Sequence, residues 1–284
     1  MTVSQGKSRC TRACRKQTAL AHRFLGAIYY HQGHFRRAID CAAQTVASLQ
    51  GAQRHERFGL PILPAVIARA YLAAGHAELG TFAEGRACGD EGLQIAEAVA
   101  HPASLMVASW GSGVLALRQG DLPRALSQLE RAVGICQEAD FAVYFPEMAG
   151  VLGAAYTLGG RLADAVALLT QALEQLTATE AVVFQTLCRL SLGEAQLRAG
   201  RLEEAQALAA CELALACAHQ ERGNEAYARH LLGEIAVRRD LPERAVVETH
   251  YRAALALAEE LGMRPLQAHC HRDLGSGHAV CHER

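Results

Sequence analysis

Apolar side chains recur along nearly the whole chain at the spacing of one helix face, three and four residues apart. A period of 3.6 residues predicts amphipathic α-helices, and no segment shows the strict alternation of a half-buried strand. The longest break in the pattern lies between residues 50 and 64. The pattern predicts an all-α protein. Its predicted helices span residues 17–32, 35–50, 61–79, 82–99, 102–119, 122–139, 144–159, 162–177, 181–199, 202–221, 224–239, 242–262 and 265 to about 280.

The predicted helices form pairs that repeat every 40 residues. Three series of small residues keep this step: Gly80, Gly120, Gly160 and Gly200; Gly113, Gly153, Gly193 and Gly233; and Ala125, Ala165, Ala205 and Ala245. Such a period indicates stacked units that bury their apolar faces against their neighbours. We expect a basic, flexible segment over 1–16, one helical array over 17–280 and a tail over 281–284. The expected units are 17–50, 61–99, 102–139, 144–177, 181–221, 224–262 and a partial unit over 265–280.

The two glycine series have different expected roles. The crossing glycines (the series of Gly113) and the alanines should lie where the two helices of a unit cross, since a larger side chain would hold their backbones apart. The turn glycines (the series of Gly80) follow the first helix of a unit, where a left-handed residue commonly ends a helix. Asp121 and Pro123 add an N-cap acceptor and a tolerated proline at the start of the next helix.

This register resembles the tetratricopeptide repeat (TPR). In the fourth unit Leu152, Gly153, Tyr156, Gly160 and Ala165 match its signature of L-G-x-x-Y followed by further small residues. The match is also strong in the first, third and fifth units. The resemblance implies a right-handed α-solenoid of about six and a half helix pairs.

Two units depart from the pattern. Ala73 and Gly85 replace the crossing glycine and the alanine of the second unit, and Arg239 and Asp240 stand where the turn glycine of the sixth belongs. The period is 40 residues rather than 34, so we expect longer helices than the family norm. HEAT repeats share the longer period, but they lack this register, and they remain a minor alternative.

The resemblance also implies which side chains face a partner. In TPR arrays the concave surface comes from the first helix of each unit, at positions around the crossing glycine. Two interpretations stay open: a solvated face with helix ion pairs such as Glu194–Arg198 and Glu234–Arg238, or a mixed-charge groove, floored by Trp110 and Tyr227, that binds an extended or helical peptide. The candidate positions are Arg23, Tyr30, His31, Trp110, Leu117, Arg118, Glu194, Leu197, Arg198, Tyr227, His230, Glu234 and Arg238.

Three segments resemble a narrower family. Residues 57–61 (RFGLP), 118–125 (RQGDLPRA) and 258–266 (AEELGMRPL) are similar to the carboxy-terminal TPR array of large bacterial signalling ATPases, many of which carry an adenylate/guanylate cyclase domain. In that family the array is thought to sense or bind a partner and to control the ATPase. The resemblance implies a regulatory arm, detached or truncated because neither upstream domain is present.

The favoured hypothesis is a non-enzymatic protein-interaction or regulatory module that binds a protein or peptide in its concave groove, with a cyclase or ATPase as one candidate partner. The first rival is a small-ligand sensor that controls an ATPase or transcriptional regulator in trans; a deep closed pocket would favour it over an open groove. The second rival is an enzyme, and no assembled acid/base or nucleophilic motif supports it.

Composition narrows the partners and the compartment. Lys and Arg total 28 against 29 Asp and Glu, so no overall attraction to nucleic acid or to an anionic membrane is expected. The first 16 residues lack the apolar region of a secretory signal, and no apolar run reaches the length of a bilayer span, so neither a signal nor a span is expected. Its ten cysteines are scattered through helical patterns, which is typical of reduced thiols used as small apolar residues in the cytoplasm.

Two local motifs suggest chemistry that their contexts do not support. Gly6, Lys7 and Ser8 resemble the end of a phosphate-binding loop but lack its earlier glycine and strand. The densest group of potential metal ligands lies near the carboxyl end and consists of His269, Cys270, His271, His278, Cys281 and His282. His269 and His271 point to different helix faces, so we favour a frayed terminal helix and predict no metal or cofactor.

The carboxy-terminal half-unit lacks the second helix that would cover it. Its apolar edge of Leu266, Cys270 and Leu274 is therefore expected to remain open and to invite self-association, because terminal units of solenoids need a polar cap. Weak hydrogen-exchange protection is expected beyond about residue 272.

Overall fold

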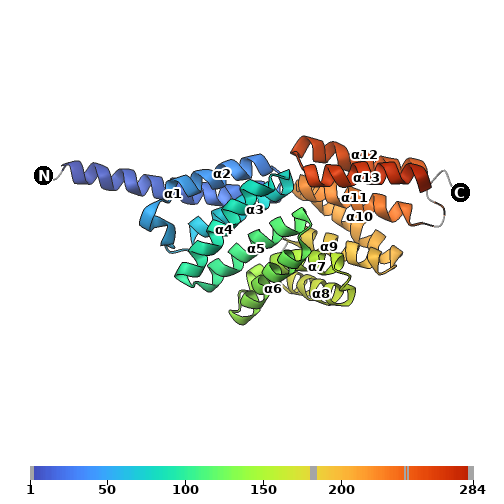
Figure 1. Ribbon diagram of the computed structural model, residues 1–284, viewed down its shortest axis with the longest axis horizontal. Helices are drawn as coiled ribbons and strands as arrows, with labels where there is room; N and C mark the ends of the chain where they lie inside the picture. Colours follow the sequence, from blue (N-terminus) through green and yellow to red (C-terminus); the bar gives the residue numbers. More distant parts are fainter. Residues whose placement is uncertain (1–2, 180–183, 240, 242, 281–284) are drawn as a thin grey trace.

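The computed structural model describes residues 3–179, 184–239, 241 and 243–280, and the side chains of those between 17 and 275. Within these ranges every regular element is helical (Figure 1), which confirms the all-α prediction. None of the described helices is both long enough and apolar enough to cross a membrane. The elements are α1 (Val3–His31), α2 (Phe35–Ser48), η1 (Gly51–His55), α3 (Pro64–Leu79), α4 (Phe82–Val99), α5 (Pro102–Gln119), α6 (Leu122–Glu138), η2 (Ala142–Tyr144), α7 (Phe145–Leu158), α8 (Leu162–Ala178), α9 (Gln185–Arg198), α10 (Leu202–His219), α11 (Arg222–Val237), α12 (Arg244–Leu261) and α13 (Arg264–Val280).

The helices pack as the predicted pairs. Each odd-numbered helix contacts the even-numbered helix that follows it, from α1 with α2 to α11 with α12, and α13 packs on α12. Odd-numbered helices of neighbouring units also contact one another; for example, α3 contacts α5 and α7 contacts α9. The prediction of six helix pairs and one further helix is confirmed.

The first helix begins earlier than predicted. It starts at Val3 rather than residue 17, so residues 3–16, which we expected to form a flexible terminus, are helical. No proline interrupts this stretch, and glycine inside a helix costs only about 1 kcal/mol. Gly6, Lys7 and Ser8 lie inside the helix, which excludes a phosphate-binding loop there.

The crossing glycines lie where packed helices approach most closely. A Cβ atom on Gly153 would lie 2.6 Å from side-chain atoms of Leu169 on the partner helix, and one on Gly113 would lie 2.5 Å from Leu129. These separations are far below van der Waals contact, so the helices can approach this closely only without a side chain at these positions. The predicted role of the crossing glycines is confirmed.

The turn glycines adopt the left-handed backbone that their positions predicted. Gly80, Gly120, Gly160 and Gly200 have φ between +68° and +83°, and Gly33 of the first unit has φ +82°. The start of α6 is capped as expected, since Oδ1 of Asp121 accepts a hydrogen bond from the amide of Arg124 at 3.2 Å.

The array closes on itself instead of remaining an open superhelix. The ends of α2 and α3 meet α11, α12 and α13, while the middle units pass below them in Figure 1. The backbone amide of Arg222 donates to the carbonyl of Gln32 at 3.3 Å, and Nε of Arg264 donates to the carbonyl of Leu79 at 2.7 Å. We call this contact between the first two units and the last two the seam.

Apolar burial stabilises the seam. Phe35, the first residue of α2, is 5% exposed and packs in one cluster with side chains of α11, α12 and α13. Burying a phenylalanine is worth about 1.5–3 kcal/mol. The other buried members of the cluster are Ala226, Ala254, Ala258, Leu261, Met263, Leu266 and Cys270.

The prediction that the apolar edge of α13 remains open is wrong. Leu266 and Cys270 are fully or almost fully buried, and Leu274 packs beside Tyr251. The apolar edge that we expected to promote self-association is therefore covered within the chain, because α12 and α3 lie against it. His278, Cys281 and His282 lie outside the described side chains.

Replacing Gly153 with leucine should lower stability by about 1–3 kcal/mol, because the new side chain must displace Leu169. Gly134 of α6 is a matched control, since a Cβ there meets nothing within 4 Å. Gly134→Leu should be neutral or stabilising by up to about 1 kcal/mol through helix propensity. Urea unfolding followed by circular dichroism measures both changes; equal midpoints for the two variants would contradict the crossing role.

Candidate functional site

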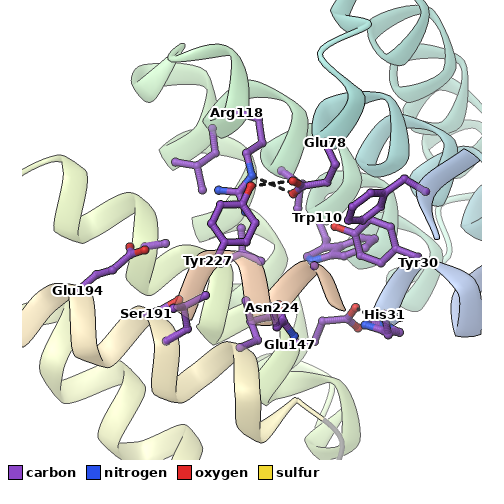
Figure 2. Close-up of a pocket in the computed structure, with 18 residues that line it drawn as sticks. Tyr30, His31, Glu78, Trp110, Arg118, Glu147, Ser191, Glu194, Asn224 and Tyr227 are labelled. Atoms are coloured by element: carbon purple, nitrogen blue, oxygen red, sulfur yellow. Dashed lines mark hydrogen bonds and ion pairs between the residues drawn. The ribbon is translucent and has the colours of Figure 1, made fainter. Parts of the chain in front are cut away.

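A largely enclosed cavity of about 90 Å³ lies inside the closed array. Side chains from all six odd-numbered helices from α1 to α11 line it, because the first helix of each unit faces the inside of the ring. The lining residues labelled in Figure 2 are Tyr30, His31, Glu78, Trp110, Arg118, Glu147, Ser191, Glu194, Asn224 and Tyr227. The seam therefore turns a concave surface into a cavity.

A hydrogen-bonded group crosses the seam at the edge of the cavity. Figure 2 shows Arg118 and Tyr227 both directed at the carboxylate of Glu78. Nε of Arg118 donates to Oε1 at 2.8 Å, and the hydroxyl of Tyr227 donates to Oε2 at 2.7 Å. The guanidinium carbon of Arg118 also lies 4.6 Å from the centre of the Tyr227 ring. Arg118 is thus already neutralised by Glu78.

His31 and Glu147 face each other at another part of the wall (Figure 2). Nε2 of His31 lies 3.8 Å from Oε1 of Glu147, which is too far for a hydrogen bond. Burial lowers the pKa of His31 to about 4 and raises the pKa of Glu147 to about 8. Both groups are therefore largely uncharged at pH 7, and Oε1 of Glu147 has no hydrogen-bond partner among the described residues.

A second carboxyl and an indole complete the polar lining. Burial, followed by the nearby Glu234, raises the pKa of Glu194 to about 7. Nε1 of Trp110 is buried and has no hydrogen-bond partner among the residues the structure describes. Leaving a buried polar atom unpaired costs about 1–3 kcal/mol, so the cavity offers both an acceptor and a donor to a ligand.

Aromatic rings form the wall of the cavity between these polar groups. Tyr30 and Trp110 line the cavity at a ring separation of 6.1 Å, and Tyr71 packs behind them, 5.4 Å from Trp110. All three contacts within this group are edge-to-face, the arrangement that aromatic pairs favour. The rings present a rigid apolar wall.

A wider pocket of about 410 Å³ adjoins the cavity, and the two share His31, Leu187 and Asn224. Its wall is mainly apolar and includes Phe24 and Ile28, each 51% exposed. Phe184 lies against His31 with ring centres 5.4 Å apart, where the two pockets meet. Its φ of +70° is unusual for a bulky residue, and such backbone strain concentrates at functional sites.

Seven of the thirteen predicted concave residues line the cavity: Tyr30, His31, Trp110, Leu117, Arg118, Glu194 and Tyr227. Trp110 and Leu117 are 2% and 8% exposed, so they belong to the wall of a closed cavity and not to the floor of an open groove.

The other six lie elsewhere. Arg23 is buried beside Phe24, Leu197 is buried in the core of the fifth and sixth units, and Arg198 and Arg238 are exposed. His230 and Glu234 form a separate cluster with Asp273. Among the described residues neither Glu194–Arg198 nor Glu234–Arg238 forms an ion pair; Arg238 instead donates to the backbone carbonyl of Glu234 at 3.3 Å.

Sequence reasoning missed Glu78 and Glu147, and the same register would have found them. Glu78 follows Ala73 by five residues, as Arg118 follows Gly113, and Glu147 precedes Gly153 by six, as Tyr227 precedes Gly233. The second unit offers no crossing glycine from which to count, since Ala73 takes its place.

Comparison with solved structures shows the class of fold. The chain is similar to a Rap protein complexed with Competence and Sporulation Factor (TM-score 0.63, 19% identity, 86% of this chain and 65% of that one). It is also similar to a signal transduction ATPase with numerous domains (STAND) that carries a TPR sensor, from Pyrococcus horikoshii (TM-score 0.55, 12% identity, 93% and 42%). A third similar structure is the apo form of RapI (TM-score 0.58, 12% identity, 94% and 99%).

The chain spans less than two thirds of the first two of these proteins. At these identities the likeness establishes the fold: the chain is an all-α TPR-type solenoid, as its register predicted. No model of a known protein family and no curated protein matches the sequence.

Proposed function

We propose that this protein is a non-enzymatic sensor that binds a short peptide, through one basic side chain, in the cavity of the closed array. The observation that carries the proposal is the seam, because the contact of Tyr227 with Glu78 encloses what would otherwise be an open groove. A deep closed pocket is the feature that favours a ligand sensor over a docking groove for a folded protein.

The charges of the cavity favour a cation. Three carboxyl groups line it, from Glu78, Glu147 and Glu194, against the single guanidinium of Arg118. Since Arg118 is paired with Glu78 and burial keeps His31 neutral, two carboxyls are left without a cationic partner inside the cavity. An ammonium or guanidinium group would donate hydrogen bonds to them and would stabilise their ionised forms.

The aromatic wall fits the same ligand chemistry. Cations bind over the faces of tryptophan and tyrosine rings, with a gain of about 0.5–2 kcal/mol that grows when water is excluded. Tyr30 and Trp110 line the cavity together with the carboxyl groups, and the guanidinium of Arg118 already makes such a contact with the ring of Tyr227.

The adjoining pocket supports a peptide rather than a free cation. The inner cavity of about 90 Å³ suits the end of one side chain, whereas the outer pocket of about 410 Å³ has an apolar wall. Ligand pockets of a few hundred Å³ are typical of small-molecule sites. A basic residue inside and an apolar neighbour outside would fill both.

The comparisons support a sensory role. One array of this fold holds a bound factor in the Rap complex, and another is the TPR sensor of a STAND ATPase. We therefore propose that ligand binding stabilises the closed form of the array, and that a signalling ATPase or cyclase responds to this shift. A ligand shifts such an equilibrium by its difference in affinity for the two forms.

The fluorescence of Trp110 tests the proposal directly, because it is the only tryptophan of the chain and lines the cavity. Equimolar mixtures of acetylated tripeptide amides would be titrated, with arginine, citrulline or glutamate at the central position. Citrulline has the shape of arginine without its charge. Losing a charged hydrogen bond costs about 1.5–3 kcal/mol, so the citrulline mixture should bind about 10- to 100-fold more weakly than the arginine mixture.

Arg201→Gln is the control, since Arg201 is exposed in the turn between α9 and α10, outside the cavity. It should leave the titration unchanged. Equal binding of all three mixtures, or no saturable response to the arginine mixture, would contradict the proposal.

A further inference from the structure

A second cluster of functional side chains lies outside the cavity, between α11 and α13. His230 and Glu234 belong to α11 and Asp273 belongs to α13, and one potential ligand atom from each lies within 4.8 Å of the others. Nε2 of His230 is 2.9 Å from Oδ2 of Asp273. These two side chains are only 12% and 14% exposed.

The sequence builds this cluster from two facing helix turns. His230 and Glu234 are four residues apart, so they share one face of α11. His269 and Asp273 have the same spacing on α13, and the ring centre of His269 lies 6.2 Å from that of His230. Two such pairs on neighbouring helices converge on one point, with His269 within reach of it.

We propose that His230, Glu234 and Asp273 bind a divalent transition-metal ion, with Zn²⁺ as the best fit, and that His269 or water supplies the fourth ligand. Imidazole nitrogen and carboxylate oxygen are ordinary zinc ligands, at about 2.0–2.2 Å. Three ligand atoms within 4.8 Å of one another can contact one such ion after small side-chain movements. Carboxylate-only sites suit Mg²⁺ and Ca²⁺, whereas imidazole favours zinc.

Neighbouring groups hold the ligands in place. Nε of Arg272 donates to Oδ1 of Asp273 at 2.7 Å, and a second nitrogen of Arg272 lies 3.1 Å from Oδ2. The ring of Tyr251 lies 5.4 Å from that of His230 and limits its rotation. Such outer contacts orient metal ligands and tune their affinity. Arg272 stays on the carboxylate when the ion replaces the direct contact between Asp273 and His230.

The site would join the last helix to the sixth unit. α13 also packs against α3 at the seam, where Leu266 and Cys270 meet Phe35. A bound ion would therefore stabilise the docking of α13, and through it the closed array, by binding the folded form alone. The three proposed ligands lie outside the terminal histidine and cysteine cluster considered in the sequence; His269 belongs to that cluster, and its ring centre lies 6.2 Å from that of His230.

The test uses the full chain after removal of metals by a chelator. Zn²⁺ would be titrated while the midpoint of thermal unfolding is followed, and Co²⁺ would serve as a coloured probe of the ligands. We expect one equivalent to bind, with a rise in the midpoint and the visible bands of Co²⁺ held by nitrogen and oxygen. Glu234→Gln keeps the size of the side chain and should weaken binding at least 10- to 100-fold, the loss that even an outer contact produces.

His271→Gln is the matched control on α13, because His271 is exposed and faces away from the site. It should leave binding and the rise in midpoint unchanged. A thiolate charge-transfer band with Co²⁺, or affinity unaffected by Glu234→Gln, would place the ion at cysteines and overturn the proposal. Absence of any saturable binding would overturn it equally.

Discussion

Replacing Gly33 with asparagine is expected to open the closed array. A Cβ atom on Gly33 would lie 2.5 Å from the backbone nitrogen of Gly223 and 3.1 Å from its Cα. Neither of these atoms can move without shifting α11, so we expect a cost near the upper end for overpacking, about 3 kcal/mol. The first unit should separate from the sixth, and Trp110 should become accessible to a quencher such as acrylamide.

Gly200→Asn separates this effect from the turn itself. Gly33 and Gly200 occupy the same register and have φ of +82° and +78°, but a Cβ on Gly200 meets nothing within 4 Å. Asparagine tolerates this left-handed backbone better than most residues. Gly200→Asn should therefore keep the small-angle X-ray scattering profile and the quenching of the parent protein. If Gly33→Asn keeps them too, the glycine contact does not hold the array closed.

Replacing Glu147 with glutamine should weaken binding of an arginine peptide by about 10- to 100-fold, since a charge-assisted hydrogen bond is lost. The same substitution should not lower the free energy of unfolding at pH 8. The pKa of Glu147 is about 8 in the folded protein and about 4.3 in an unfolded chain. The folded form therefore holds the extra proton between these values, and the contribution of Glu147 to stability falls as the pH rises through that interval.

Glutamine does not ionise, so it avoids the loss of stability that Glu147 causes as the pH rises. Glu147→Gln should therefore be at least as stable as the parent at pH 8 while binding more weakly. If Glu147 had only a structural role, its replacement would lower the stability of the protein. Thermal unfolding at pH 8 and the Trp110 titration together decide between the two roles. Lower stability with unchanged binding would contradict a ligand role for Glu147.

The same pKa shifts set the pH dependence of binding. A bound guanidinium favours the ionised forms of Glu147 and Glu194, whose pKa values are about 8 and about 7 in the free protein. Protons must leave on binding, so affinity should fall as the pH drops below 7, by up to about tenfold per pH unit for each proton released. Arginine keeps its charge throughout. The slope should be shallower in Glu147→Gln, and an affinity independent of pH between 5.5 and 8 would argue against these carboxyls.

Much of the fold could be predicted from the sequence because helix formation and helix pairing depend on residues close together in the chain. The 3.6-residue period set the helices, and the steric needs of Gly113, Gly153 and the turn glycines set the pairing within each unit. The start of α1 differs from the prediction because a basic composition does not by itself prevent a helix, and no proline interrupts residues 3–16.

The seam could not be predicted in the same way, because it joins residues about 150 to 230 positions apart. A small change in the angle between successive units accumulates along an array and decides whether its ends meet. Nothing in the register of a single unit distinguishes Gly33, which touches Gly223, from Gly160, which touches nothing within 4 Å. For the same reason Trp110 was assigned to an open groove, whereas closure places it in the wall of a cavity.

A double-mutant cycle on Glu78 and Tyr227 measures whether the array is closed in solution. These residues are 149 positions apart, and the tyrosine hydroxyl lies 2.7 Å from the carboxylate. Glu78→Gln, Tyr227→Phe and the double variant would be unfolded in urea beside the parent protein. In a closed array we expect a coupling energy of about 1.5–3 kcal/mol, the value of a hydrogen bond to a charged group. Additivity within about 0.5 kcal/mol would mean that the two residues do not meet in solution, and that the array is open.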